Sequence, residues 1–158
     1  QAGCASFLDG CFICQPTLLF RRSLFALLGP LHDRLRTAFD FDYWLRLFKW
    51  MPDRVGFIDD VQAHSRLHAR GITRRMRREV ALEGMAVLKR HLGQAPLHWA
   101  LTHVAEIRAA AKAGGNTDER AEIARFVRDA QALLSPHDAE RLRIDSGGRL
   151  DRDRPGFN

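Results

Sequence analysis

Apolar residues return at helical spacing along most of the chain, and each such stretch predicts an amphipathic helix. The predicted helices cover residues 17–28, 39–50, 73–93, 97–113 and 117–134. Gly29 and Pro30 are suited to end the first helix, and Thr73 is suited to cap the third. Asp118 and Glu119 favour the start of the last helix, because a carboxylate is stabilised in the first turn.

Two other segments have different patterns. Residues 55–61 alternate and contain β-branched and aromatic side chains, which predicts a short strand. From Asp145 onward the composition turns to Gly, Arg, Asp and Pro with almost no apolar residues, which predicts disorder. The pattern therefore predicts a chain that is predominantly helical with a few short strands.

The amino-acid composition limits the size and type of domain that the chain can form, but it does not indicate one particular function. A chain of 158 residues with 46% hydrophobic content has room for one ordinary domain, or for half of a larger domain plus an appendage. Arginine or lysine interrupts the longest apolar runs, so we expect no membrane-spanning helix. The net charge of +6 suits nucleic acid, an anionic membrane or a phosphate-rich substrate, and much of it lies in Arg74, Arg75, Arg77 and Arg78.

The cysteines lie close together near the start of the chain, at Cys4, Cys11 and Cys14. Their odd number and the lack of a signal peptide before the first helix predict reduced thiols in the cytoplasm. Cys11 and Cys14 form a C-x-x-C pair without a second pair, so we expect small buried side chains here rather than a zinc site. Because the chain begins with Gln1, we expect it to be a piece of a longer protein.

Two clusters of polar residues are candidates for chemistry. Asp40 and Asp42 begin an otherwise apolar helix, where Asp42 can pair with Arg46 one turn on, so we interpret Asp42 as structural and Asp40 as the functional carboxylate. Arg66 and His68 lie on the loop that follows the predicted strand. An arginine there can grip phosphate oxygens and a histidine can bind phosphate or a metal, although an exposed basic loop would look the same.

In this order along the chain, these motifs resemble the second half of the catalytic domain of family 2 glycosyltransferases of the GT-A fold. The matching pieces are Gln15-Pro16-Thr17, Phe20-Arg21-Arg22-Ser23, Leu28-Gly29, residues 40–47 (DFDYWLRL), Phe57-Ile58-Asp59, and Ala63 with Arg66-Leu67-His68 and Thr73. The resemblance implies an α/β fragment, a partial GT-A (Rossmann-like) half-domain, over residues 1–72. The resemblance covers roughly residues 12–93, and the helical pattern predicts a helical extension over residues 73–144, before the predicted disordered tail of residues 145–158.

The resemblance also implies roles for individual residues. Asp40 matches the family's general base, which deprotonates the acceptor hydroxyl in an inverting displacement, while Phe39 replaces the usual preceding glutamate. Arg66 and His68 match a loop that closes on the diphosphate. The residues expected on the acceptor side are Gln15, Pro16, Arg21, Asp42 and Trp44.

The resemblance further implies a nucleotide-diphosphate sugar donor and a saccharide or lipid-linked acceptor, in polysaccharide or glycoconjugate synthesis. Mg²⁺ or Mn²⁺ would be bound mainly by a missing N-terminal half, with His68 as a candidate ligand in this chain. We expect a cytoplasmic protein with peripheral contact at the inner face of the membrane, no nucleic-acid partner, and no activity from these residues alone.

Two other classes of function remain open. One is a basic helical module that binds nucleic acid through residues 74–78, although no recognisable motif and few aromatic residues accompany these arginines. The other is a helical interaction domain without catalysis, which would account for residues 97–144 and leave Asp40 unexplained.

Overall fold

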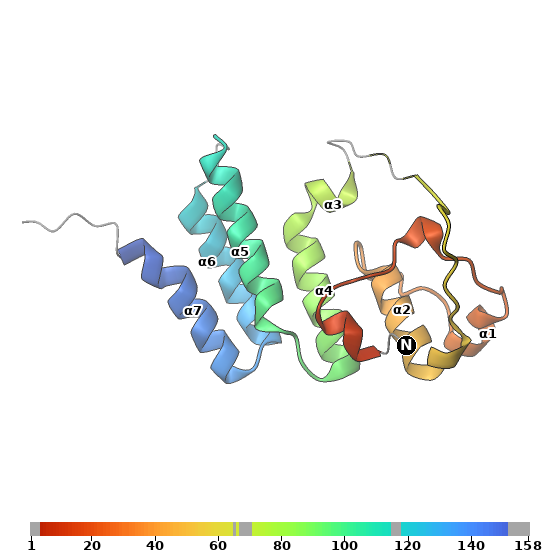
Figure 1. Cartoon of the computed structure of the whole chain (residues 1–158). Helices are drawn as coiled ribbons and strands as arrows, with labels where there is room; N and C mark the ends of the chain where they lie inside the picture. Colours follow the sequence, from red (N-terminus) through yellow and green to blue (C-terminus); the bar gives the residue numbers. More distant parts are fainter. Residues whose placement is uncertain (1–3, 65, 67–70, 115–117, 152–158) are drawn as a thin grey trace, which may run out of the picture. The chain divides into compact units, whose positions relative to one another are not determined.

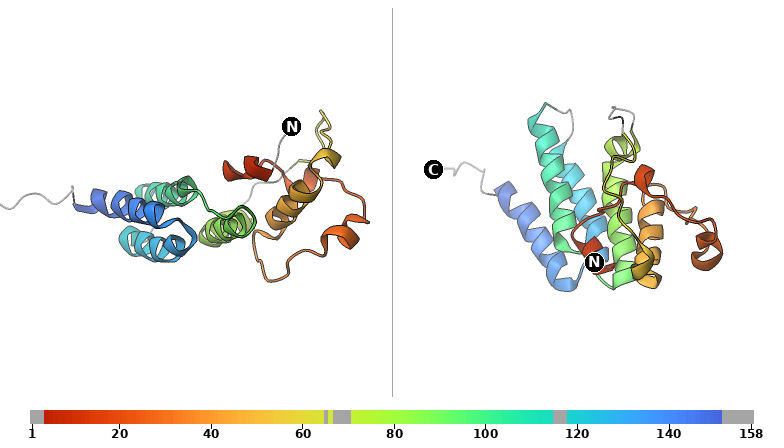
Figure 2. Two further views of the ribbon diagram at one scale, coloured as in Figure 1. Left: turned by 90° about the horizontal axis from the view of Figure 1, so that it is seen from below. Right: turned by 45° about the vertical axis from the view of Figure 1, so that its right-hand side comes forward.

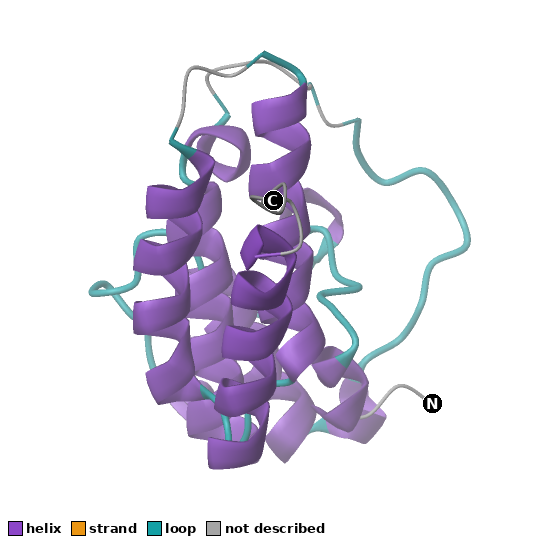
Figure 3. Cartoon of the chain, turned by 90° about the vertical axis from the view of Figure 1, so that its left-hand side faces the viewer, coloured by secondary structure: helices purple, strands orange, loops and turns teal. Residues whose placement is uncertain are grey.

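The computed structural model describes residues 4–64, 66, 71–114 and 118–151 of the chain. Within these residues the fold is built from helices joined by loops, and it contains no strand (Figure 3). The chain forms two compact units, Gln1–Leu92 and Gly93–Asn158. The predicted organisation instead placed a boundary between residues 72 and 73.

Unit 1 is organised around two helices that pack against each other, α2 (Phe39–Trp50) and α4 (Arg77–Leu92) (Figure 1). Two short helices accompany them, α1 (Leu24–Leu28), which contacts α2, and α3 (Ile72–Arg75), which contacts α4. Single 3-10 turns at Cys4–Leu8, Gln15–Thr17 and Pro52–Arg54 complete this unit.

Helix α2 forms as predicted and is the most buried element of unit 1. It is apolar on nearly all sides, and its buried residues are Phe41, Asp42, Tyr43, Trp44, Leu45, Leu47 and Phe48. Phe7 from the first 3-10 turn is fully buried, with its ring 5.7 Å from that of Phe41 and 5.1 Å from that of Phe48. Met85 and Leu88 of α4 are fully buried as well. Burial of this apolar surface holds α2 between the N-terminal segment and α4.

A carboxylate from α4 binds the segment that leads into α2. Glu83 Oε2 accepts hydrogen bonds from the backbone N–H groups of Thr37 (2.7 Å) and Ala38 (3.0 Å) and from the Thr37 hydroxyl (2.7 Å). Glu83 Oε1 accepts from the Arg36 N–H at 3.0 Å. These donors belong to the N-cap residue Ala38 and to the two residues before it, so the carboxylate holds the segment that leads into α2 against α4, and its negative charge lies near the N-terminus of α2.

Unit 2 consists of three helices that pack pairwise, α5 (Leu97–Lys112), α6 (Glu119–Ala130) and α7 (Pro136–Asp151) (Figure 2). The 3-10 turn Gln131–Leu133 leads from α6 toward α7. The apolar residues buried in these helices include Ala100, Val104, Ile107, Ile123, Phe126, Val127, Ala130 and Leu142. Asp118, expected in the first turn of this helix, instead precedes it and caps α6 by accepting a hydrogen bond from the Ala121 N–H at 3.2 Å.

The predicted α/β fold is wrong, because the described residues form no sheet. The expected strand at residues 55–61 is a loop in which Phe57 is 89% exposed and Val61 is 69% exposed. A strand is stable only when a neighbouring strand pairs with its N–H and C=O groups, and no described segment supplies one. Alternation of side chains alone was therefore a misleading signal.

The bounds of two predicted helices also differ from the structure. Of residues 17–28, only Leu24–Leu28 is α-helical, and Gly29, with φ of 78°, ends this helix. The helix expected from Thr73 is broken at Met76 into α3 and α4, and Gly71, rather than Thr73, is the residue that precedes α3.

The tail predicted to be disordered from Asp145 is helical as far as Asp151, and residues 152–158 lie outside the described part. Ser135 supports the start of this helix, since its hydroxyl accepts from the Asp138 N–H at 3.1 Å and donates to the Asp138 carboxylate at 2.9 Å. None of the helices in the described part is long and apolar enough to cross a membrane.

Candidate functional site

Helix α2 carries the two candidate carboxylates, Asp40 and Asp42, in its first turn. Two residues along an α-helix are separated by about 200° around its axis, so these side chains leave the helix on nearly opposite sides. Asp42 is buried, with 2% of its surface exposed, whereas Asp40 is partly exposed. The two carboxylates therefore have different surroundings although they are close in sequence.

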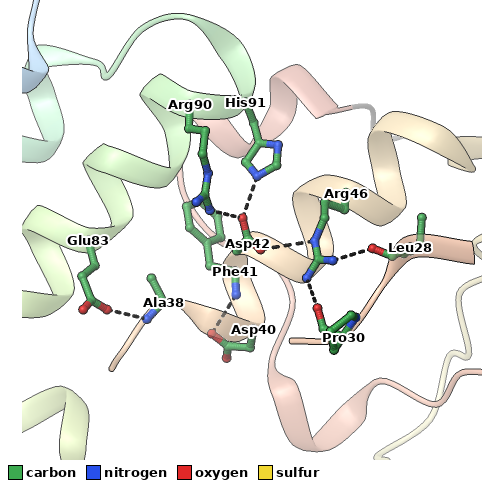
Figure 4. A network of polar contacts seen from close by, with 10 residues as sticks. All are labelled: Leu28, Pro30, Ala38, Asp40, Phe41, Asp42, Arg46, Glu83, Arg90 and His91. Carbon is green, nitrogen blue, oxygen red and sulfur yellow. Dashed lines mark hydrogen bonds and ion pairs between the residues drawn. The ribbon is translucent and has the colours of Figure 1, made fainter. Parts of the chain in front are cut away.

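Asp42 is held by three basic side chains (Figure 4). Its Oδ2 lies 3.2 Å from Arg46 Nε, one turn along α2. Its Oδ1 pairs with Arg90 Nη2 and lies 2.7 Å from His91 Nε2, both from the end of α4. This cluster joins the two main helices of unit 1.

Arg46 extends the cluster to the segment that follows α1. Its Nη1 donates to the Leu28 carbonyl at 2.5 Å and its Nη2 donates to the Pro30 carbonyl at 2.8 Å. The guanidinium carbon also lies 4.8 Å from the centre of the Tyr43 ring. Arg46 thus connects the end of α1 to α2 and holds these two segments in place relative to each other.

The surroundings of Asp42 favour its ionised form. Burial raises the pKa of this carboxyl, but the hydrogen bond from His91 and the charges of Arg90, Arg46 and His91 together outweigh burial and lower the pKa below its ordinary value. A carboxylate that is neutralised by cations on both oxygens is a poor proton acceptor. The interpretation of Asp42 as an ion-pair partner of Arg46 agrees with this geometry, which adds two further partners.

A pocket of about 460 Å³ opens beside this cluster. It is lined by one continuous loop segment, Pro30 to Arg34, and by four charged or polar residues of the helices, Asp42, Arg46, Arg90 and His91. Neither Asp40 nor Arg66 lines it.

Asp40 takes no part in the cluster around Asp42 (Figure 4). Its Oδ1 accepts a hydrogen bond from the Phe41 N–H at 2.7 Å, and none of the described residues offers it a cationic partner. Its negative charge acts on the Cys11 thiol. Partial desolvation raises the pKa of this thiol, a hydrogen bond to the Ile13 backbone partly opposes this, and the charge of Asp40 raises the pKa further. Both cysteines of the C-x-x-C pair are exposed, so the expectation of small buried side chains there is wrong. Asp40 is therefore an ionisable group without a charge partner at the start of a helix.

The other expected site residues are distributed over unit 1. Gln15 and Pro16 lie in an exposed 3-10 turn, and Arg21 is exposed in the loop before α1. Trp44 is 3% exposed, and its Nε1 has no hydrogen-bond partner among the described residues. Of the acceptor-side set, Gln15, Pro16 and Arg21 are thus open to solvent, whereas Asp42 and Trp44 belong to the core.

No contact links Asp40 to the described part of the basic loop. Arg66 is exposed, and no hydrogen bond or ion pair joins it to Asp40 within the described residues. His68, the expected diphosphate and metal ligand, lies outside the described residues. The described residues also contain no group of three or more His, Cys, Asp or Glu side chains arranged to hold a metal ion.

Sequence reasoning missed Glu83, Arg90 and His91, although each interacts with α2 or the loop before it. Their partners are more than 40 residues away in sequence, so no local spacing relates them. The only signal was that the helix predicted to end at Gly93 carried Arg90 and His91 in its last turn.

No protein-family model, curated protein or solved structure matches the chain.

Proposed function

We propose that this chain is the acceptor-side part of a nucleotide-sugar-dependent glycosyltransferase, with Asp40 as the general base. The observation that carries the proposal is the contrast between the two carboxylates of α2. Asp42 is buried and paired with three basic groups, whereas Asp40 is partly exposed and has no cationic partner among the described residues. This contrast is what the resemblance of residues 40–47 to family 2 glycosyltransferases would require.

In the proposed reaction, the acceptor hydroxyl attacks the anomeric carbon of the donor sugar. A new C–O bond forms, the bond to the nucleoside diphosphate breaks on the opposite face of the sugar, and the anomeric configuration inverts. Asp40 accepts the hydroxyl proton, which requires an ionised carboxylate within hydrogen-bond reach of the acceptor. The exposed residues Gln15, Pro16 and Arg21 are available to line an acceptor, which would be a saccharide or a lipid-linked saccharide.

The donor side of the reaction is assigned mainly to residues outside this chain. Arg66 is exposed, so its guanidinium is available to bind a diphosphate. Its positive charge would offset the negative charge that develops on the leaving group. The described residues do not supply a ligand set for Mg²⁺ or Mn²⁺, so no step is assigned to a metal here. A cytoplasmic location is part of the proposal.

The test is sugar transfer by the protein that joins this chain to a nucleotide-binding half, measured with labelled nucleotide sugars. Asp40→Asn keeps the size of the side chain and removes the base, so kcat should fall by about 10²-fold to 10⁴-fold. The matched control is Asp53→Asn, which changes an exposed carboxylate of the same unit and should leave kcat unchanged. Undiminished transfer by the Asp40 variant would show that the base is another group.

The alternative is a basic helical module that binds nucleic acid. It is favoured by the absence of a sheet from the described residues and by the exposure of Arg74, Arg75 and Arg77 in α3 and at the start of α4. Phosphate contacts would make affinity for a DNA or RNA duplex fall steeply with added salt. A salt titration of duplex binding therefore tests this alternative. If the chain does not bind DNA or RNA even at low salt, the nucleic-acid function is ruled out.

A further inference from the structure

The pocket beside Asp42 contains more basic than acidic groups. Its acidic lining residues are Asp33 and Asp42, and its basic lining residues are Arg34, Arg46 and Arg90 together with two histidines, His32 and His91. Two carboxylates against three guanidinium groups leave an excess of positive charge even when both imidazoles are neutral. Excess charge around a concave surface attracts anions.

Part of this basic set is already committed to the fold. Arg46 donates to the carbonyls of Leu28 and Pro30 and pairs with Asp42, and it is only 19% exposed. His91 contacts the same carboxylate at 2.7 Å. These groups shape the pocket and have little capacity left for a ligand.

Three other groups retain donor capacity. The Arg90 side chain is 45% exposed, and its contact with Asp42 is made through Nη2, while a guanidinium carries five N–H donors. Arg34 is exposed and forms no hydrogen bond or ion pair with a described residue. His32 Nδ1 is buried and has no hydrogen-bond partner among the described residues. Because Nδ1 is enclosed, His32 can donate to a ligand in the pocket only through its other ring nitrogen, Nε2.

We propose that this pocket is an anion site for a phosphate-bearing molecule, with Arg34, Arg90 and His32 as its ligand-binding residues. Guanidinium groups match the oxygen geometry of phosphate, and several donors converging from a loop and a helix suit a group with three acceptor oxygens. The volume of about 460 Å³ leaves room for more than one phosphoryl group or for a phosphate ester. Asp42 does not prevent binding, because Arg46, Arg90 and His91 already offset its charge.

This site is independent of the proposed glycosyltransferase activity. It lies on the Asp42 side of α2, and Asp40 does not line it. Phosphate binding should therefore be unchanged in Asp40→Asn, so failure of one proposal does not decide the other.

The experiment titrates the full chain with inorganic phosphate and with pyrophosphate at constant ionic strength, using calorimetry or amide chemical shifts. We expect saturable binding, tighter for pyrophosphate, that weakens about tenfold in Arg34→Gln through loss of a charge-assisted hydrogen bond. Arg34 is the decisive position because it is exposed and has no hydrogen bond or ion pair with a described residue to lose on substitution. Arg90→Gln should weaken binding as well, and Arg54→Gln, at an exposed arginine of the same unit, should not.

A second arm separates a soluble phosphate ester from a lipid headgroup. Phosphatidylcholine vesicles containing phosphatidic acid are sedimented with the chain, with and without pyrophosphate. If the chain binds the vesicles, and this binding is displaced by pyrophosphate and weakened by Arg34→Gln, the ligand is a lipid phosphate. If the chain binds pyrophosphate saturably but does not bind the vesicles, the ligand is a soluble phosphate ester. The proposal is overturned if pyrophosphate does not bind saturably, or if Arg54→Gln weakens binding as much as Arg34→Gln.

Discussion

Replacing Asp42 by Asn tests the claim that this carboxylate holds unit 1 together. The substitution keeps the shape of the side chain and removes a charge that is 3% exposed and in contact with Arg46, Arg90 and His91. Breaking a buried ion pair by removing one partner typically costs about 3–5 kcal/mol, because an uncompensated charge remains.

The cost here should be smaller, because the remaining cations have other means of stabilisation. Arg90 is 45% exposed and can be hydrated, and Arg46 keeps two carbonyl acceptors at 2.5 and 2.8 Å. We therefore expect Asp42→Asn to lower the free energy of unfolding by about 2–3 kcal/mol.

Urea unfolding at neutral pH measures this change. In a Trp99→Phe background the tryptophan fluorescence comes from Trp44 and Trp50 of unit 1, of which Trp44 is buried, so it reports on unit 1, and circular dichroism reports on the helices. Asp53→Asn is the matched control at an exposed position and should change stability by less than about 0.5 kcal/mol. A loss below about 0.5 kcal/mol in Asp42→Asn would refute the reasoning, because the cluster would then contribute nothing to unit 1.

Three further outcomes are expected. Glu83→Gln should lower the free energy of unfolding by about 1–2 kcal/mol, because the amide has no charge and keeps only one of the two oxygens that accept four hydrogen bonds from the segment leading into α2. Unchanged urea unfolding in this variant would contradict the role of Glu83 in holding that segment. The pKa values of Asp42 and Glu83 are lowered in the fold, so their stabilisation is complete above the unfolded values of 3.8 and 4.5 and is lost as pH falls through the folded values. Unfolding measured from pH 7 to pH 2 should show this loss, and the double variant Asp42→Asn with Glu83→Gln should lose less stability on acidification than the unmodified chain. Phe126→Ala should cost about 3–5 kcal/mol because this ring is fully buried in unit 2, and a calorimetric transition that is unaltered would contradict the packing described for α5, α6 and α7.

The sequence predicted those features that depend on neighbouring residues. Helix α2 was predictable because its apolar residues recur at helical spacing, and the pairing of Asp42 with Arg46 was predictable because residues four apart share a helix face. The acidic start of α6 at Asp118 and Glu119 was predictable for a similarly local reason, although the cap that Asp118 forms was not predicted.

The errors and omissions concern contacts between distant parts of the chain. Residues 55–61 have a strand-like alternation, but strand formation depends on a partner, and none of the described segments provides one. The contacts of Glu83 with the start of α2 and of Arg90 and His91 with Asp42 arise only when α4 packs on α2. The helical residues 145–151 were missed because Ser135 and Asp138 begin α7 upstream of the segment whose composition suggested disorder.

The central claim is that α2 presents one structural carboxylate and one that is free to accept a proton. The most direct test measures sugar transfer and the free energy of unfolding on the same preparations of Asp40→Asn. The account predicts a fall in kcat of about 100-fold or more with a loss of stability below about 1 kcal/mol, because no described cation depends on Asp40 and only its charge at the start of α2 is removed. Transfer at the unmodified rate, or a loss of transfer that only parallels unfolding, would contradict it.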